Sequence, residues 1–219
     1  MASVHVEVFS DVVCPWCFIG KRRLETAVAN LAAKGVKIDL EITYRPYQLD
    51  PTAPSHEPTP VIDAYAKKFG GHERAAEIIA HVTSVAAQDG INFRMDLALR
   101  ANTALAHRLL AYALSEHGAG VQSQLKERLL RAYFEDGLDI GSIDVLASCA
   151  QEVGIDRVAA TSHLESDAGI SELAEELLFA AQNDITAVPT FIFDDKWSVP
   201  GAQDVAVFER VLMKLSEKN

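Results

Sequence analysis

Two cysteines three positions apart, Cys14 and Cys17, are the residues whose type and spacing point most directly to chemistry. In the motif Cys14-Pro15-Trp16-Cys17, the two sulfurs are close enough along the chain to close a disulfide ring or to work as a dithiol. The thiolate form of cysteine attacks disulfides, and exchange then passes through a mixed disulfide with the partner. The motif therefore predicts a thiol–disulfide exchange centre.

The flanking sequence places this motif between a strand and a helix. Apolar and polar residues alternate over residues 4–10, and good helix formers run over residues 15–31 until Gly35. Free N–H groups and the positive end of the helix dipole stabilise an anion at a helix N-terminus, so we expect a lowered pKa for Cys14. We assign Cys14 as the attacking thiol and Cys17 as the resolving thiol.

The motif could also be part of a metal site or a pair of inert buried thiols. A structural zinc ion takes about four ligands, usually two cysteine pairs or one pair with histidines. No second such pair exists, no two histidines have ligand spacing, and Cys149 stands alone in a helical pattern typical of a small buried residue. The redox interpretation is favoured over both, and we expect no metal.

Composition argues against several classes of function. The 219-residue chain has a net charge of −11, which disfavours nucleic acid as a partner because phosphate binding needs clustered Lys and Arg. The first residues lack the basic and apolar regions of a signal peptide, and no apolar run approaches the ~18 residues of a membrane span. We expect a cytoplasmic protein, where thiols stay reduced and such a motif is catalytic or metal-binding.

Several segments together resemble the DsbA-like thioredoxin superfamily and, more narrowly, its cytosolic FrnE-type subgroup. These segments are residues 11–20 around the motif, Asn102-Thr103 followed by Ala106-His107, Val188-Pro189-Thr190-Phe191, and Gly201-Ala202-Gln203. The resemblance spans residues 4–218. It implies a thioredoxin fold with a large helical insertion and a disulfide oxidoreductase or isomerase activity on protein or peptide thiols.

The resemblance also implies roles outside the two cysteines. Pro189, which alone would be an ordinary strand-start proline, is implied to be cis and to face Cys14. The backbone of Val188, with Thr190 beside it, is implied to pair with an extended substrate peptide. Trp16 stands where periplasmic relatives often carry a histidine that stabilises the thiolate, and tryptophan cannot be a cation. We therefore do not expect strong oxidising power.

Asp11 and His107 are weaker candidates for support of the site. Asp11 could accept a proton through water during exchange, but we favour a role in satisfying the loop before Cys14. His107 could face the site from the helical segment, although a surface or internally hydrogen-bonded histidine is the simpler interpretation.

The order of predicted elements is that of an α/β protein. A second strand over residues 36–44 completes a β–α–β unit, five of the eight prolines follow in a linker, and helical patterns cover residues 61–163. A helix from residue 170, a hairpin and a last helix over residues 203–218 end the chain. We predict a discontinuous thioredoxin-fold domain, residues 1–50 and 168–219, and a helical insertion domain, residues 51–167.

Two other functions fit parts of this pattern. Glutathione-dependent isomerases or transferases of the kappa or 2-hydroxychromene-2-carboxylate isomerase type resemble the chain in architecture, but they usually keep serine at the position of Cys14. A non-catalytic helper in secondary metabolism would not need an intact dithiol. We expect no bound cofactor, glutathione as a candidate redox partner, and a monomer or homodimer.

Overall fold

The computed structural model describes residues 2–55 and 57–217 and has a four-stranded sheet in the order β2-β1-β5-β6. The N-terminal unit consists of β1 (Ala2–Ser10), α1 (Pro15–Ala33) and β2 (Ile38–Pro46), with the two strands parallel. The predicted β–α–β unit is confirmed. β2 begins two residues later than the alternation indicates, because Val36 still donates its N–H to the carbonyl of Leu31 at 3.0 Å.

The C-terminal part completes the sheet. Its elements are α7 (Ile170–Gln182), β5 (Thr190–Phe193), β6 (Trp197–Pro200) and α8 (Val205–Ser216). β5 is antiparallel to β1 and to β6. The hairpin between β5 and β6 turns at Asp194 and Asp195, whose φ angles of 47° and 54° suit tight hairpins. The predicted hairpin is confirmed, and the predicted end of the last helix, Lys218, lies outside the described residues.

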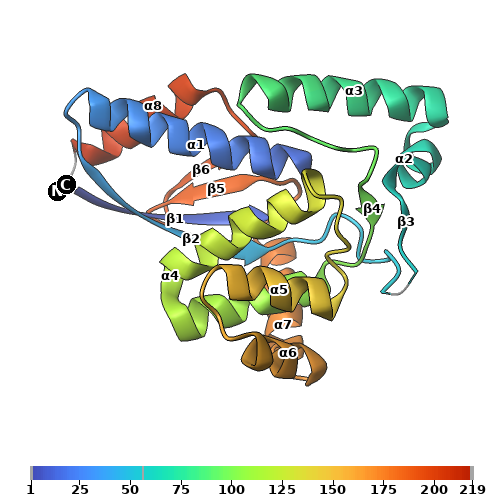
Figure 1. Cartoon of the computed structure of the whole chain (residues 1–219). Helices are drawn as coiled ribbons and strands as arrows, with labels where there is room; N and C mark the ends of the chain where they lie inside the picture. Colours follow the sequence, from blue (N-terminus) through green and yellow to red (C-terminus); the bar gives the residue numbers. More distant parts are fainter. Residues whose placement is uncertain (1, 56, 218–219) are drawn as a thin grey trace.

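Helices cover both faces of the sheet (Figure 1). α1 and α8 lie side by side on one face, and α7 contacts β2 from the other. α4 (Ala104–Phe134) consists of two helical parts that meet at a kink at Gly118 (φ 83°, ψ 173°), and Gln122 of its second part bonds the backbone edge of β2. This arrangement is the thioredoxin fold with a helical insertion that the sequence predicts. The sequence pattern predicts an apolar face on α7 that consists of Leu173, Leu177 and Ala181. That face is partly wrong, because Leu173 and Leu177 are half-buried but Ala181 is exposed and its neighbour Ala180 is buried.

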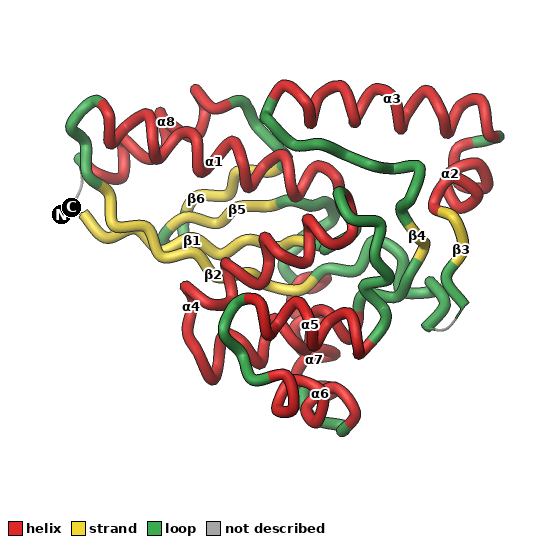
Figure 2. Tube along the Cα trace, viewed as in Figure 1, coloured by secondary structure: helices red, strands yellow, loops and turns green. Residues whose placement is uncertain are grey.

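The segment between β2 and α7 is mostly helical. Besides α4 it contains β3 (Thr59–Pro60), α2 (Val61–Phe69), α3 (His72–Gln88), β4 (Leu99–Arg100), α5 (Ile143–Glu152) and α6 (Arg157–Glu165). The short β3–β4 pair escapes a search for periodicity because each strand has two residues. Figure 2 shows this pair with α2 and α3 beyond the end of the sheet where β1 stops. The boundaries at residues 50 and 168 stay a prediction.

Two hydrophobic cores meet at α1. The sheet core lies between the sheet and the pair α1 and α8, and includes Leu24 and Phe208. The helical core takes Phe18 from the opposite side of α1 and packs it against Phe93 and Phe134, with ring centroids 6.0 and 6.2 Å away. Among the helices of the described ranges, none has both the length and the apolar character needed to cross a bilayer.

Candidate active site

Cys14 and Cys17 lie where the chain passes from β1 to α1. Cys14 is the N-cap residue of α1 with an extended backbone (φ −89°, ψ 113°), and Pro15 is the first helical residue. The N–H of Cys17 donates to the carbonyl of Cys14 at 3.1 Å, and each sulfur affects the pKa of the other. Both are free thiols and each is only 3% exposed. The first turn of α1 therefore assembles a buried dithiol.

The loop before β5 contacts this dithiol. The Val188–Pro189 peptide bond is cis, and the Cys14 thiol donates to the carbonyl oxygen of Val188 at 3.6 Å. The hydroxyl of Thr190 donates to the carbonyl of Ala187 at 2.8 Å, and the residue is buried. Val188 thus reaches the reactive sulfur, whereas the Thr190 side chain stabilises its own loop.

Gly20 allows α1 and this loop to approach closely. A Cβ atom at Gly20 would lie 3.0 Å from Cγ of Pro189 and 3.2 Å from Cζ of Phe191. On its other side, the carbonyl of Pro189 accepts the N–H of Gly201 at 2.7 Å. The absence of a side chain at Gly20 therefore helps to fix where the loop sits relative to Cys14.

Burial and the neighbouring sulfur shift the pKa of both thiols. Burial, followed by the interaction with Cys17, raises the pKa of Cys14 well above its ordinary value of 9.0. Burial opposes ionisation of Cys17 too, but Cys14, the charge of Lys126 and the hydroxyl of Ser10 lower the pKa of Cys17. The two sulfurs titrate together, so the first thiolate belongs to the pair, and an acidic Cys14 stays a prediction.

Asp11 and His107 form a buried pair next to the dithiol. Asp11 Oδ1 accepts the N–H of Val12 at 2.8 Å and His107 Nε2 at 3.1 Å, while Oδ2 accepts the N–H of Leu49 at 2.8 Å. His107 Nε2 also lies 3.0 Å from the carbonyl oxygen of Tyr47, so this nitrogen carries the proton and donates to both. For both residues the geometry agrees with the simpler interpretation. Asp11 accepts hydrogen bonds from the loop before Cys14, and His107 is internally hydrogen-bonded.

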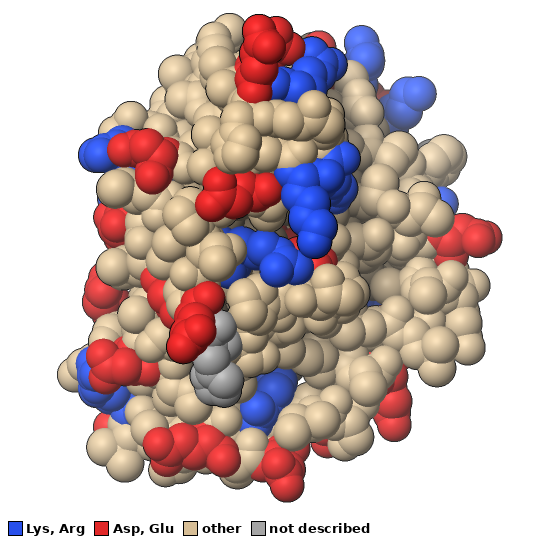
Figure 3. Space-filling model, turned by 90° about the vertical axis from the view of Figure 1, so that its right-hand side faces the viewer, with Lys and Arg blue, Asp and Glu red and all other residues tan. Residues whose placement is uncertain are grey.

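A groove of about 760 Å³ opens beside Cys14 and reaches the helical segment. Trp16 lines it, is 37% exposed, and lies 6.4 Å from the ring of His81 on α3. Lys67, Lys68 and Arg100 add positive charge to the lining. Figure 3 looks onto this end of the molecule and shows Lys and Arg side chains gathered across its middle. Cys14, but not Cys17, faces a space that a substrate can enter.

Comparison with known proteins identifies the family of this site. Residues 5–213 match the DSBA-like thioredoxin domain. The chain belongs to the DSBA-like thioredoxin family. At the level of this family, the substrates are thiols or disulfides.

Two relatives of this DSBA-like chain match it over nearly their whole length. It is 34% identical to the uncharacterized protein YwbO of Bacillus subtilis over 229 residues, which cover 99% of both chains. The crystal structure of the probable DsbA oxidoreductase SCO1869 from Streptomyces coelicolor is 28% identical, with a TM-score of 0.87 over 99% of this chain and 91% of that one.

A 2-hydroxychromene-2-carboxylate isomerase structure is also similar in fold. It has a TM-score of 0.69 at 16% identity and covers 98% of this chain and 97% of its own. At that identity the likeness concerns the fold alone. The fold therefore does not separate an oxidoreductase from an isomerase, and the residues at the dithiol have to do so.

Sequence reasoning missed three residues of the DSBA-like site: Ser10, Gly20 and Lys126. Gly20 is part of the segment that carries the resemblance, but nothing in one sequence shows which atoms it approaches. Lys126 carries a visible signal, because it lies three and four positions before Leu129 and Leu130 of a buried stripe. A lysine at such a position faces the interior, where an unpaired charge is unusual.

Proposed function

We propose that the protein is a thiol–disulfide oxidoreductase that uses Cys14 and Cys17 on protein or peptide thiols. One arrangement supports this above all: two free thiols lie in the first turn of α1, and one of them lines the groove beside Val188. A purely structural role gives no reason for a free thiol to face a groove.

Exchange requires two displacements. A proton passes from Cys14 to the Cys17 thiolate, and the Cys14 thiolate attacks a substrate disulfide, whose S–S bond breaks and releases one thiolate. Cys17 then gives up its proton to solvent and attacks the sulfur of Cys14, which breaks the mixed disulfide and releases the second substrate thiolate. The protein dithiol is oxidised to a disulfide while one substrate disulfide is reduced. The reverse sequence oxidises a substrate dithiol.

The proposal includes the finer assignments that the sequence resemblance implies. They are a FrnE-type subgroup, a cytoplasmic location, no resident cofactor, glutathione as a redox partner, and a substrate peptide held by the backbone of Val188. Lys67 and Lys68 line the groove and are suited to attract the two carboxylates of glutathione, whereas Arg100 is paired with Asp50 and Asp63 adds a negative charge to the lining.

Serine variants of the three cysteines test the proposal. We expect Cys14→Ser to abolish exchange with a fluorescein-labelled peptide disulfide, and Cys17→Ser to accumulate a mixed disulfide at Cys14 that mass spectrometry detects. Cys149→Ser is the matched control, because Cys149 is a buried thiol in α5 away from the groove, and it should keep full activity. Full activity of Cys14→Ser would overturn the proposal. Glutathione-dependent turnover that survives in Cys17→Ser would instead favour the isomerase class.

A further inference from the structure

Lys126 on α4 is buried without a hydrogen-bond partner. The residue is 1% exposed, and its Nζ is one of two buried side-chain nitrogens in residues 2–55 and 57–217 that no hydrogen bond satisfies. The other, His163 Nε2, lies within the helical segment. A buried ammonium group without a counter-charge is costly, so the group either loses its proton or pairs with an anion.

The groups around Lys126 leave the dithiol as the natural source of that anion. Nζ lies 5.6 Å from the ring centroid of Tyr44, a favourable cation–π position. Burial lowers the pKa of Lys126, and Cys17 first, then Asp11 and Cys14, act in the opposite direction, while Lys21 adds to the lowering. The oxygens of Asp11 are already occupied by three donors.

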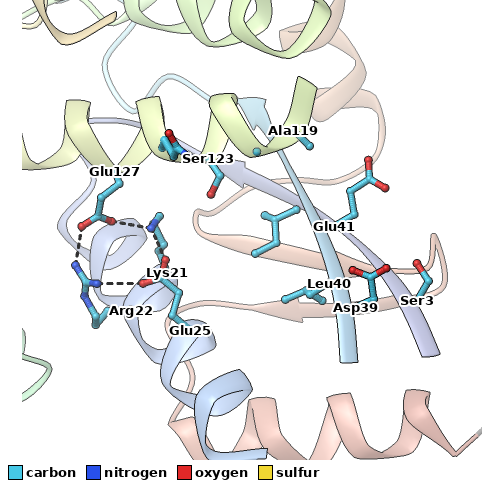
Figure 4. Close-up of a pocket in the computed structure, with 13 residues that line it drawn as sticks. Ser3, Lys21, Arg22, Glu25, Asp39, Leu40, Glu41, Ala119, Ser123 and Glu127 are labelled. Atoms are coloured by element: carbon cyan, nitrogen blue, oxygen red, sulfur yellow. Dashed lines mark hydrogen bonds and ion pairs between the residues drawn. The ribbon is translucent and has the colours of Figure 1, made fainter. Parts of the chain in front are cut away.

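An ion-pair cluster fixes the position of Lys126 relative to α1. Glu127, the next residue of α4, accepts Lys21 Nζ and Arg22 Nη2, each at 2.7 Å, and both of these cations also contact Glu25. Figure 4 shows this cluster at one side of a second cavity, of about 750 Å³, which no cysteine lines. These ion pairs join α4 to α1 one residue away from Lys126.

We propose that the ammonium group of Lys126, supplied by the helical segment, is the internal counter-ion of the thiolate that forms at the Cys14–Cys17 pair. The proposal rests on the proposed function and names Lys126 as a positioning residue that acts through Cys17. Its charge stabilises the reduced, thiolate-bearing state. In the disulfide state no thiolate exists, and the buried charge loses its counter-ion. Both effects make the pair more oxidising, because the reduced form gains stability and the oxidised form loses stability.

The test compares the wild type with Lys126→Met, which keeps the bulk of the side chain and removes the charge. We expect the thiolate absorbance of the dithiol to titrate at higher pH, with about a tenfold loss of thiolate at neutral pH for each pKa unit. In a glutathione redox buffer, the equilibrium should shift toward the disulfide form, and a rise of one pKa unit contributes up to about tenfold when the wild-type pair carries a full thiolate. Lys126→Arg, which keeps the charge, should restore both values toward those of the wild type.

Arg131→Met is the matched control. It removes a positive charge from the same helix at a side chain that is 57% exposed and paired with Glu135, so it should leave titration and equilibrium unchanged. If Lys126→Met fails to fold, Lys126→Gln carries the same test. If Lys126→Met or Lys126→Gln folds and titrates as the wild type does, the counter-ion role is overturned. The proposed function then still stands, provided that Cys14→Ser is inactive. An active Cys14→Ser would instead remove the proposed function itself.

Discussion

The thioredoxin part and the helical segment bury their polar groups in different ways. In the thioredoxin part the buried polar side chains are spread over the β1–α1 unit and β5, and they are Ser10, Asp11, Lys21 and Thr190. Helix α4 of the helical segment, in contrast, carries four of the nine buried polar or charged residues found in the described ranges. These four are His107, Arg108, Gln122 and Lys126.

Three of these α4 side chains act on the sheet side of the molecule. His107 binds Asp11, and Lys126 acts on Cys17. The amide of Gln122 bonds both the N–H and the carbonyl of Tyr44, at 2.8 and 2.9 Å, and so pairs with β2 as a neighbouring strand would. The thioredoxin part thus supplies the sulfurs, and the inserted part supplies polar groups that surround them. If this division is right, a substitution that removes a contact between the two parts should lower stability or exchange rate more than an equivalent substitution within either part.

Asp11→Ala should have the largest effect on stability. The change removes the acceptor for three donors, from Val12, Leu49 and His107, inside the protein. Breaking a buried pair in this way costs about 3–5 kcal/mol, which chemical denaturation measures as a change in the free energy of unfolding.

Asp156→Ala is the comparison within the helical segment. Asp156 caps α6 by accepting a single N–H, that of Ala159, at 2.8 Å. Loss of such a cap costs about 1 kcal/mol. Equal costs for the two aspartate variants would contradict the view that Asp11 joins the two parts.

Asp11 and His107 also show what one sequence can and cannot reveal. The strand, the helix start and the positions of Cys14 and Cys17 follow from alternation and spacing within some thirty residues, and the structure has them where predicted. Asp11 and His107 are 96 residues apart, so no local pattern brings them together.

The ionisation of the dithiol depends on contacts that are equally distant in the sequence. A helix N-terminus is a local feature, and it favours a charge on Cys14. The burial that raises the pKa of Cys14, and the charge of Lys126 that lowers the pKa of Cys17, both arise from the packing of distant segments on α1. Composition and periodicity predict which face of a helix is buried, but they do not predict which residues will contact it.

Gly20→Ala should have an intermediate effect. The new methyl group would lie 3.0 Å from Pro189 and 3.2 Å from Phe191, closer than carbon atoms pack. Overpacking of this kind costs about 1–3 kcal/mol, and we expect a loss of exchange rate as the loop moves away from Cys14. Gly120→Ala in α4 is the control, because no atom lies within 4 Å of its added Cβ, and it should be neutral or stabilising by up to about 1 kcal/mol. Unchanged exchange in a folded Gly20→Ala variant would show that the loop does not depend on this contact.

Glu127→Gln should have the smallest effect, and that effect should depend on pH. Burial opposes ionisation, but Lys21 and Arg22 lower the pKa of Glu127 below its ordinary value of 4.5. The folded state therefore binds this proton less tightly than the unfolded state, so the contribution is fully present above pH 4.5 and disappears as the pH falls through the lower folded value.

At neutral pH we expect a loss of up to about 1 kcal/mol, because the ion pairs that join α1 and α4 are partly screened by water. The comparison is Glu77→Gln, within α3, where the pair with Arg74 is exposed on both sides and should contribute less. Denaturation of both variants and the wild type at neutral pH and at a series of pH values below 4.5 measures the difference. A Glu127→Gln effect that does not fall as the pH is lowered would mean that the side chain stabilises the α1–α4 contact by packing rather than by charge.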